Sequence, residues 1–102
     1  MSDAASQGAD AGIGALRRTL SIANKRGLHA RAAAKFVRTA GQFDSTIRVS
    51  FKGQEVSGLS IMGLMMLAAG IGTSIDVSCS GPQAVEAMAA ISALVEGKFG
   101  ED

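Results

Sequence analysis

The chain has 102 residues, 47% of them hydrophobic, which fits a single domain with a modest, mainly aliphatic core. Its net charge is only +1, but seven of the ten cations lie between residues 17 and 38, where no Asp or Glu occurs. Such a basic cluster suggests an acidic partner, a phosphate or a nucleic acid, although a solvated positive face explains it as well. One cysteine excludes an internal disulfide, and with one histidine and one cysteine we expect no metal site.

Residues 1–14 are small and polar and lack the basic start and apolar centre of a signal peptide, so we expect a disordered tail. The longest apolar stretch, residues 59–71, has 13 residues, whereas a bilayer span needs about 20. Cys79 lies in an alternating pattern and is expected in the core. We therefore predict a soluble, cytoplasmic protein without membrane insertion, with one domain at residues 15–99 and a short tail at residues 100–102.

Alternating apolar and polar residues from Leu16 onward predict a first strand with one buried face. A turn over residues 24–28 follows, and Gly27 permits a backbone conformation there that a side chain would resist. Good helix formers after His29 predict a helix that ends near Gly41. Its apolar stripe is expected to face the core through Ala33, Phe36, Val37 and Ala40.

Residues 47–51 alternate again and predict a second strand, and a tight reversal leads to a short third strand over residues 54–57. Ser60 has the chemistry of an N-cap, a residue whose side chain accepts a free N–H group of the first helical turn. It predicts a short helix over residues 61–69, closed by Gly70.

Residues 74–80 predict a fourth strand, and a last helix follows whose apolar face includes Val85, Met88 and Val95. The element order is therefore β-α-β-β-α-β-α. Because each strand has one polar face, the pattern favours an antiparallel sheet with all three helices on one side, which is a two-layer α+β domain.

The only histidine, His29, lies where the first helix is expected to begin. A helix N-terminus carries free N–H donors and about half a positive charge, so it attracts phosphate. Here the donors would be the backbone N–H groups of Ala30 and Arg31, and the Arg31 guanidinium can bind the same anion. Imidazole, with an ordinary pKa of about 6.5, is a nucleophile at neutral pH. No acidic partner accompanies the histidine, and phosphoryl transfer requires none.

Two motifs stand out at a spacing of about 30 residues: Gly27-Leu28-His29-Ala30-Arg31 and Ser60-Ile61-Met62-Gly63-Leu64-Met65-Met66-Leu67. Together they resemble the histidine-containing phosphocarrier (HPr) family of the bacterial phosphoenolpyruvate-dependent phosphotransferase system. The resemblance covers roughly residues 16–98 and extends to the family's order of elements.

The resemblance implies a four-stranded antiparallel sheet of order 1-4-2-3 covered by three helices. It implies that His29 accepts a phosphoryl group on Nδ1 from phosphorylated enzyme I, with help from Arg31, and passes it to an enzyme IIA-type acceptor. It also implies that Ser60 is the regulatory serine that a dedicated kinase/phosphorylase modifies in many bacteria. Such a carrier is a stoichiometric intermediate rather than an enzyme and needs no cofactor. We expect it to be a monomer.

Two positions depart from the family pattern. Proline usually follows the arginine of the first motif, but this chain has Ala32, so the first helical turn is less rigid. Leu59 stands where many members have a lysine, which removes a positive charge beside Ser60. Together with the long leader, Leu59 favours the regulatory branch linked to nitrogen and potassium status over sugar uptake.

The short helix after Ser60 is apolar on both sides, and one sheet cannot bury all of it. We predict that Leu64 and Leu67 face inward. A partner-docking surface is predicted from three outward residues of this helix and two of the first helix: Ile61, Met62, Met65, Ala34 and Arg38. The alternative is that all of these apolar residues belong to the core.

Two other functions compete with a phosphocarrier. A small nucleic-acid-binding domain could use the basic residues between 17 and 38, but it lacks the aromatic side chains on which bases stack. A histidine phosphatase would need further charged groups that converge on a pocket. We therefore favour the phosphocarrier and expect no nucleic-acid partner.

Overall fold

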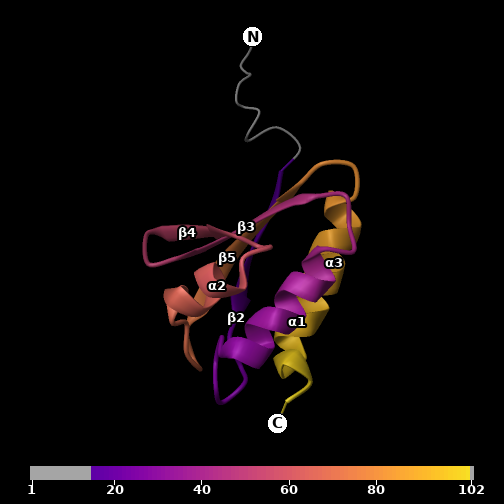
Figure 1. Ribbon diagram of the computed structural model, residues 1–102. Helices are drawn as coiled ribbons and strands as arrows, with labels where there is room; N and C mark the ends of the chain where they lie inside the picture. Colours follow the sequence, from indigo (N-terminus) through magenta and orange to yellow (C-terminus); the bar gives the residue numbers. More distant parts are fainter. Residues whose placement is uncertain (1–14, 102) are drawn as a thin grey trace.

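The strands and helices follow the predicted order β-α-β-β-α-β-α in the computed structural model, which describes residues 15–101. Residues 1–14 and Asp102, where tails were predicted, lie outside the described residues. Between residues 15 and 101, no helix has the length and apolar character needed to cross a bilayer. The elements are labelled in Figure 1: β2 (Leu16–Ser21), α1 (Ala30–Ala40), β3 (Thr46–Phe51), β4 (Gln54–Ser57), α2 (Ile61–Leu67), β5 (Ser74–Ser80), α3 (Ala84–Glu96) and the 3-10 turn η1 (Lys98–Gly100).

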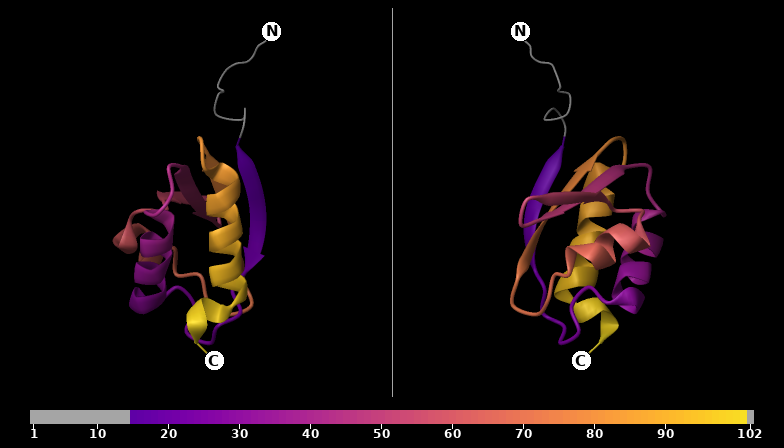
Figure 2. Two further views of the ribbon diagram at one scale, coloured as in Figure 1. Left: turned by 90° about the vertical axis from the view of Figure 1, so that its right-hand side faces the viewer. Right: turned by 60° about the vertical axis from the view of Figure 1, so that its left-hand side comes forward.

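The four strands form one antiparallel sheet in the order β2-β5-β3-β4. Numbered along the chain this order is 1-4-2-3, so the predicted topology is confirmed. Figure 2 shows the helices gathered on one side of the sheet, which confirms the two-layer α+β architecture. The register places Leu20 opposite Ile75 and Val49 opposite Val77, so each strand turns its apolar side chains toward the helices.

The core lies between the sheet and the helices α1 and α3, and its largest fully buried side chains include Phe36, Phe99 and Ile91. Cys79 is also fully buried, as predicted. Burial raises the pKa of the Cys79 thiol, and a hydrogen bond with Ser45 opposes this only in part. Because a thiolate is the reactive form, Cys79 is a packing residue rather than a nucleophile.

The opposite face of the sheet is polar and open. It carries a shallow hollow of about 420 Å³ lined mainly by arginine, hydroxyl and carboxyl side chains, including Arg17, Thr19, Ser50 and Asp76. On this face, the strand positions of the described chain carry no aromatic ring. Its lining residues belong to the strands and not to the loop or helix that carries His29.

Two helix predictions are wrong in detail. Helix α2 ends at Leu67, because Ala68 adopts a left-handed conformation (φ 58°) and closes the helix in place of Gly70. Met88 and Val95 are buried as predicted, but Val85 is 68% exposed, because Ala84 and Ala87 face the core in its place. Arg18, which interrupts the apolar series of β2, reaches α3 and donates a 2.7 Å hydrogen bond to the Ser92 hydroxyl.

Candidate phosphorylation site

The loop before α1 is held against the segment that follows α2. Gly27 has φ +65°, and a Cβ atom there would lie 2.5 Å from the carbonyl oxygen of Ala69. The next N–H group, of Leu28, donates a 3.0 Å hydrogen bond to that same oxygen. Position 27 therefore needs glycine for its backbone conformation and also for the close contact.

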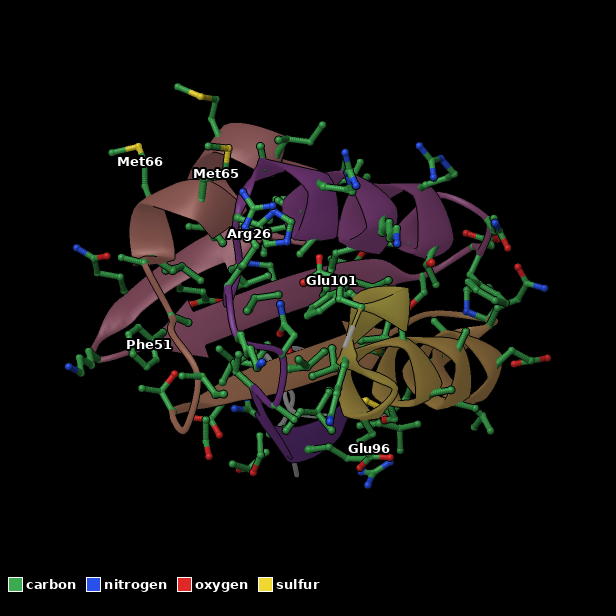
Figure 3. All side chains as sticks on the ribbon, turned by 90° about the horizontal axis from the view of Figure 1, so that it is seen from below. Arg26, Phe51, Met65, Met66, Glu96 and Glu101 are labelled. Atoms are coloured by element: carbon green, nitrogen blue, oxygen red, sulfur yellow. The ribbon has the colours of Figure 1, made fainter. Side chains whose placement is uncertain are left out.

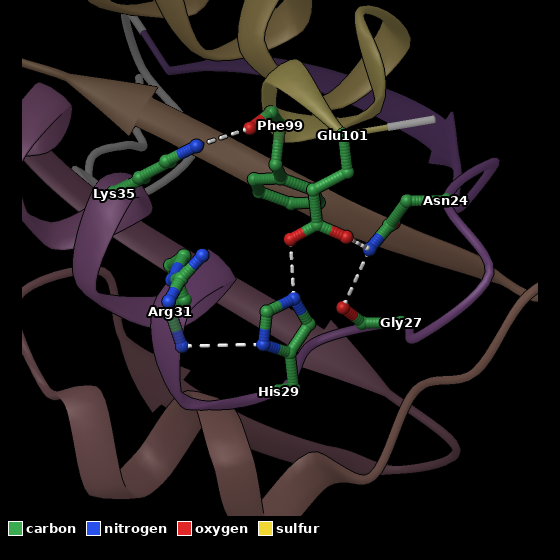
Figure 4. Close-up of polar contacts among 7 residues, drawn as sticks. All are labelled: Asn24, Gly27, His29, Arg31, Lys35, Phe99 and Glu101. Atoms are coloured by element: carbon green, nitrogen blue, oxygen red, sulfur yellow. Dashed lines mark hydrogen bonds and ion pairs between the residues drawn. The ribbon is translucent and has the colours of Figure 1, made fainter.

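His29 is the N-cap residue of α1, as the sequence predicts. Its backbone is extended (φ −74°, ψ 178°), and its carbonyl oxygen accepts a 2.9 Å hydrogen bond from the Ala33 N–H. The ring nitrogen Nδ1 accepts a hydrogen bond from the Arg31 N–H at 3.3 Å (Figure 4). Nδ1 therefore lies among the free N–H groups of a helix N-terminus, where anions are stabilised.

The other ring nitrogen of His29 contacts an acidic residue that the motifs do not contain. Nε2 pairs with the carboxylate of Glu101, and the two side chains are only 13% and 19% exposed. The expectation that no acidic group accompanies His29 is therefore wrong, and so is the placement of Gly100 and Glu101 in a tail. Gly100 belongs to η1, and Glu101 packs against the site.

Asn24 ties Glu101 to the loop that carries His29. This fully buried side chain donates hydrogen bonds from Nδ2 to the Gly27 carbonyl oxygen at 2.8 Å and to Glu101 Oε1 at 3.1 Å. The two oxygens of one carboxylate thus bind the loop and the ring, as Figure 4 shows. Asn24 and Glu101 lie 77 residues apart, so no local spacing in the sequence could have linked them.

Burial alone would raise the pKa of the Glu101 carboxyl. Hydrogen bonds from Asn24 and His29, together with the charge of Arg26 and that of the His29 ring whenever it is protonated, nevertheless leave this pKa below its ordinary value of 4.5. Because the pKa of Glu101 is lower in the folded than in the unfolded state, its contacts stabilise the fold fully at pH values above the unfolded-state pKa. This stabilisation is lost as the pH falls through the folded-state pKa. Glu101 is therefore an anion at neutral pH.

Cations surround the outer side of the site. Lys25, Arg26 and Arg31 line an open pocket of about 220 Å³ together with Glu101. In the view of Figure 3, Arg26 and Glu101, which both line this pocket, lie near each other. Arg31 is exposed, and its guanidinium makes no hydrogen bond within residues 15–101. This charge is therefore available to an anion beside Nδ1.

Ser60 caps α2, as predicted: its hydroxyl oxygen accepts a 2.9 Å hydrogen bond from the Gly63 N–H. Leu59 precedes it as an exposed apolar residue. Ala32, which replaces the proline of the family pattern, is fully buried in the first turn of α1, so its small side chain takes part in core packing.

We expect Ser60→Ala to lower the free energy of unfolding by about 1 kcal/mol, because the Gly63 N–H loses its acceptor. Urea unfolding of the two proteins measures this difference. Ser60→Asp should lose less than Ser60→Ala, since aspartate also caps helices. A Ser60→Ala protein as stable as the wild type would contradict the capping role.

The predicted orientation of α2 is confirmed. Leu64 and Leu67 are buried, whereas Ile61, Met62 and Met65 are exposed, with Met62 at 68%. Figure 3 shows the Met65 and Met66 side chains pointing outward from α2. On α1, Ala34 is half-buried and Arg38 exposed. Three further apolar side chains are exposed on or near α2: Met66 on the helix itself, Leu59 before it and Ile71 after it.

The fold and this site define a class of small carrier with a histidine at a helix N-terminus, and comparison with known proteins identifies it. Residues 16–97 match the family model described as "PTS HPr component phosphorylation site". The chain therefore belongs to the HPr family of phosphocarrier proteins of the bacterial phosphotransferase system.

Among its relatives is a phosphocarrier protein HPr from Cupriavidus necator, 50% identical over 84% of this chain and 97% of the relative. A phosphocarrier protein NPr from Shewanella violacea is 43% identical over 84% of this chain and 94% of the relative. A crystal structure of HPr from Thermoanaerobacter tengcongensis is 44% identical, covers 85% of this chain and 98% of its own, and superposes with a TM-score of 0.82.

Proposed function

We propose that His29 accepts a phosphoryl group on Nδ1 from phosphorylated enzyme I and passes it to an enzyme IIA-type acceptor. The observation that carries this proposal is the position of Nδ1, which accepts the Arg31 N–H at the start of α1. An acceptor of a hydrogen bond has a free lone pair, and attack on phosphorus uses that pair. As the P–N bond to His29 forms, the bond from phosphorus to the donor breaks and its electron pair leaves with the donor. Transfer onward reverses these steps.

The surroundings of Nδ1 suit a phosphoryl group. At 3.3 Å the hydrogen bond from the Arg31 N–H is long, so it is readily exchanged for one to a phosphoryl oxygen. The Ala30 N–H lies in the same helical turn and is a second donor in this proposal. The Arg31 guanidinium neutralises the added charge. Alignment and charge neutralisation are the main requirements of phosphoryl transfer.

The direct test is the intact mass of the protein after incubation with phosphoenolpyruvate and enzyme I, followed by mild acid. The proposal requires one added phosphoryl group that acid removes. A protein that gains no mass, or whose added phosphate survives mild acid, would rule out a phosphohistidine carrier.

Partners are proposed to dock on the exposed apolar surface of α2 and the neighbouring face of α1, formed by Ile61, Met62, Met65, Ala34 and Arg38. Methionine side chains adapt to different partner surfaces, which suits a carrier that meets a donor and an acceptor in turn. Arg38 adds a positive charge at the edge of this surface, which can attract an acidic partner.

We expect Met62→Asp to raise the half-saturating concentration of enzyme I about tenfold or more, because it places an unpaired charge in an apolar contact. The fold should survive, since Met62 is 68% exposed. Val85→Asp is the matched control, because Val85 is equally exposed but lies on α3. Equal behaviour of the two variants in the transfer assay would argue against docking through α2.

Ser60 is proposed as a site of regulatory phosphorylation. A phosphate there would lie at the N-terminus of α2, where an anion is favoured, and would add negative charge beside the apolar docking surface. The added charge should slow transfer from enzyme I. Mass analysis after incubation with the cognate serine kinase/phosphorylase tests the modification, and an unmodified Ser60 would count against it.

Relatives of this chain carry both the HPr and the NPr name, so the names do not decide between the two branches. The exposed Leu59 beside Ser60 supports the nitrogen-regulatory branch. We propose this branch, and transfer assays with a sugar-specific and a nitrogen-type IIA acceptor distinguish the two. We also propose a monomeric, cytoplasmic protein, and sedimentation measures its oligomeric state.

A nucleic-acid function has little support. The seven clustered cations do not all face the same way: Arg17 lines the open sheet face and Arg18 reaches α3, whereas Lys25, Arg26 and Arg31 line the pocket beside Glu101. They therefore do not form one continuous surface for a phosphate backbone. The sheet face that could receive bases also lacks aromatic rings at its described strand positions.

A further inference from the structure

We infer that Glu101 is a positioning residue for His29, held in place by a C-terminal strap formed by residues 97–101. Glu101 fixes the orientation and tautomer of the imidazole and supplies the counter-charge to the phosphorylated ring. This inference rests on the proposed phosphorylation of His29 for its functional part. The contact itself is independent of phosphorylation, because it exists in the free protein.

The strap is anchored in the core by the side chain of Phe99. Phe99 is fully buried in the core, and the Lys35 ammonium on α1 donates a 2.7 Å hydrogen bond to its carbonyl oxygen. The backbone then turns back on itself, and the Glu101 N–H donates a 2.9 Å hydrogen bond to the Lys98 carbonyl oxygen. These bonds direct the next side chain, that of Glu101, toward the ring of His29.

The backbone of the strap adopts an unfavourable conformation to reach this position. Lys98 and Phe99 both have positive φ angles, 59° and 54°, in the left-handed region that residues other than glycine usually avoid. Two consecutive residues of this kind persist only where the surrounding contacts outweigh the strain. Here those contacts are the buried Phe99 ring, the Lys35 hydrogen bond and the carboxylate that binds both Asn24 and His29.

The hydrogen bonds of the ring determine what Glu101 does. Nδ1 accepts from the Arg31 N–H, so the proton of the neutral ring lies on Nε2 and is donated to the Glu101 carboxylate. When Nδ1 becomes bonded to phosphorus while Nε2 keeps its proton, the ring gains positive charge. The carboxylate stabilises that charge, and it keeps the ring protonated so that it can leave as a neutral imidazole in the next transfer.

The contact can be tested without any phosphotransferase. In ¹⁵N NMR of the unphosphorylated protein, we expect a slowly exchanging Nε2–H signal from His29 that is absent in Glu101→Ala. Glu96→Ala is the matched control, because Glu96 is a glutamate near the end of α3 that pairs with Arg18 instead. A wild-type protein without this signal, or a Glu101→Ala protein that keeps it, would overturn the inference.

The functional part is tested by the kinetics of phosphoryl transfer from enzyme I. For Glu101→Ala we expect the maximal rate to fall about tenfold, by analogy with the loss of a partner that orients a metal-binding histidine. The half-saturating concentration of enzyme I should be unchanged, because Glu101 is not part of the docking surface. Glu101→Gln keeps a hydrogen-bond acceptor but not the charge, so its maximal rate should lie between those of the wild type and Glu101→Ala.

The outcomes separate this inference from the proposed function. A wild-type protein that accepts no phosphoryl group on His29 would defeat the proposed function, while the NMR signal would still decide the contact. Normal maximal rates in both Glu101 variants would defeat the positioning role and leave the phosphocarrier proposal intact. A rise in the half-saturating concentration of enzyme I without a change in the maximal rate would also defeat the positioning role, because Glu101 would then act through docking.

Discussion

Replacing His29 with alanine is expected to abolish acid-labile phosphate uptake from phosphoenolpyruvate and enzyme I. The loss should be complete, because the described residues around the site offer no second ring nitrogen to receive the phosphoryl group. Intact mass before and after mild acid measures it. A His29→Ala protein that is labelled as fully as the wild type would eliminate the proposed carrier.

His29→Asn serves as the control for folding. Asparagine is a good N-cap residue, so the start of α1 should keep an acceptor for its free N–H groups while the imidazole is lost. We expect this variant to remain folded, with an unfolding midpoint lowered only by the loss of the Glu101 contact, and still to accept no phosphate. Loss of transfer in a folded His29→Asn protein then reflects chemistry rather than instability.

The second large effect is expected from Phe99→Ala, which should lower the free energy of unfolding by about 3–5 kcal/mol. The Phe99 ring is fully buried, and its removal leaves a cavity beneath a strained turn. Domains of this size are stable by only about 5–15 kcal/mol, so urea unfolding should show a clear shift of the midpoint. A change below about 1 kcal/mol would show that the turn repacks freely.

The same variant should also release Glu101, although that residue is unchanged. Without its anchor the strap is no longer held in the left-handed conformation, so the His29 Nε2–H signal should weaken even where the protein remains folded. Phe43→Ala is a suitable control, since Phe43 only packs partly against the core. Its effect on stability should be smaller, and its effect on the ring signal absent.

Local patterns were sufficient to predict most of the fold. Alternation in the strands gave the inward and outward faces of the sheet, and Ser60 marked the start of α2 correctly because its cap is a bond within one turn. His29 at the start of α1 could be predicted for the same reason. In each case the residues that determine the feature lie within a few positions of it.

Features that depend on distant contacts could not be predicted in this way. Helix α2 ends early at Leu67, and the carbonyl oxygen of Ala69 accepts a hydrogen bond from Leu28, about 40 positions earlier in the chain. Glu101 meets His29 across 72 residues and follows a turn of a kind that helix and strand propensities disfavour. The carboxylate beside the ring thus arises from tertiary packing, and no motif in the sequence contains it.

Gly27 has no side chain, so the loop that carries His29 packs directly against the backbone that follows α2. The imidazole and the methionine-rich helix are therefore held in a fixed arrangement relative to each other. A partner that docks on the methionines of α2, as proposed, is therefore held in a fixed position relative to the His29 ring. If donor and acceptor both dock on these methionines, as proposed, they can differ in shape elsewhere and still place the phosphoryl group at the same ring nitrogen.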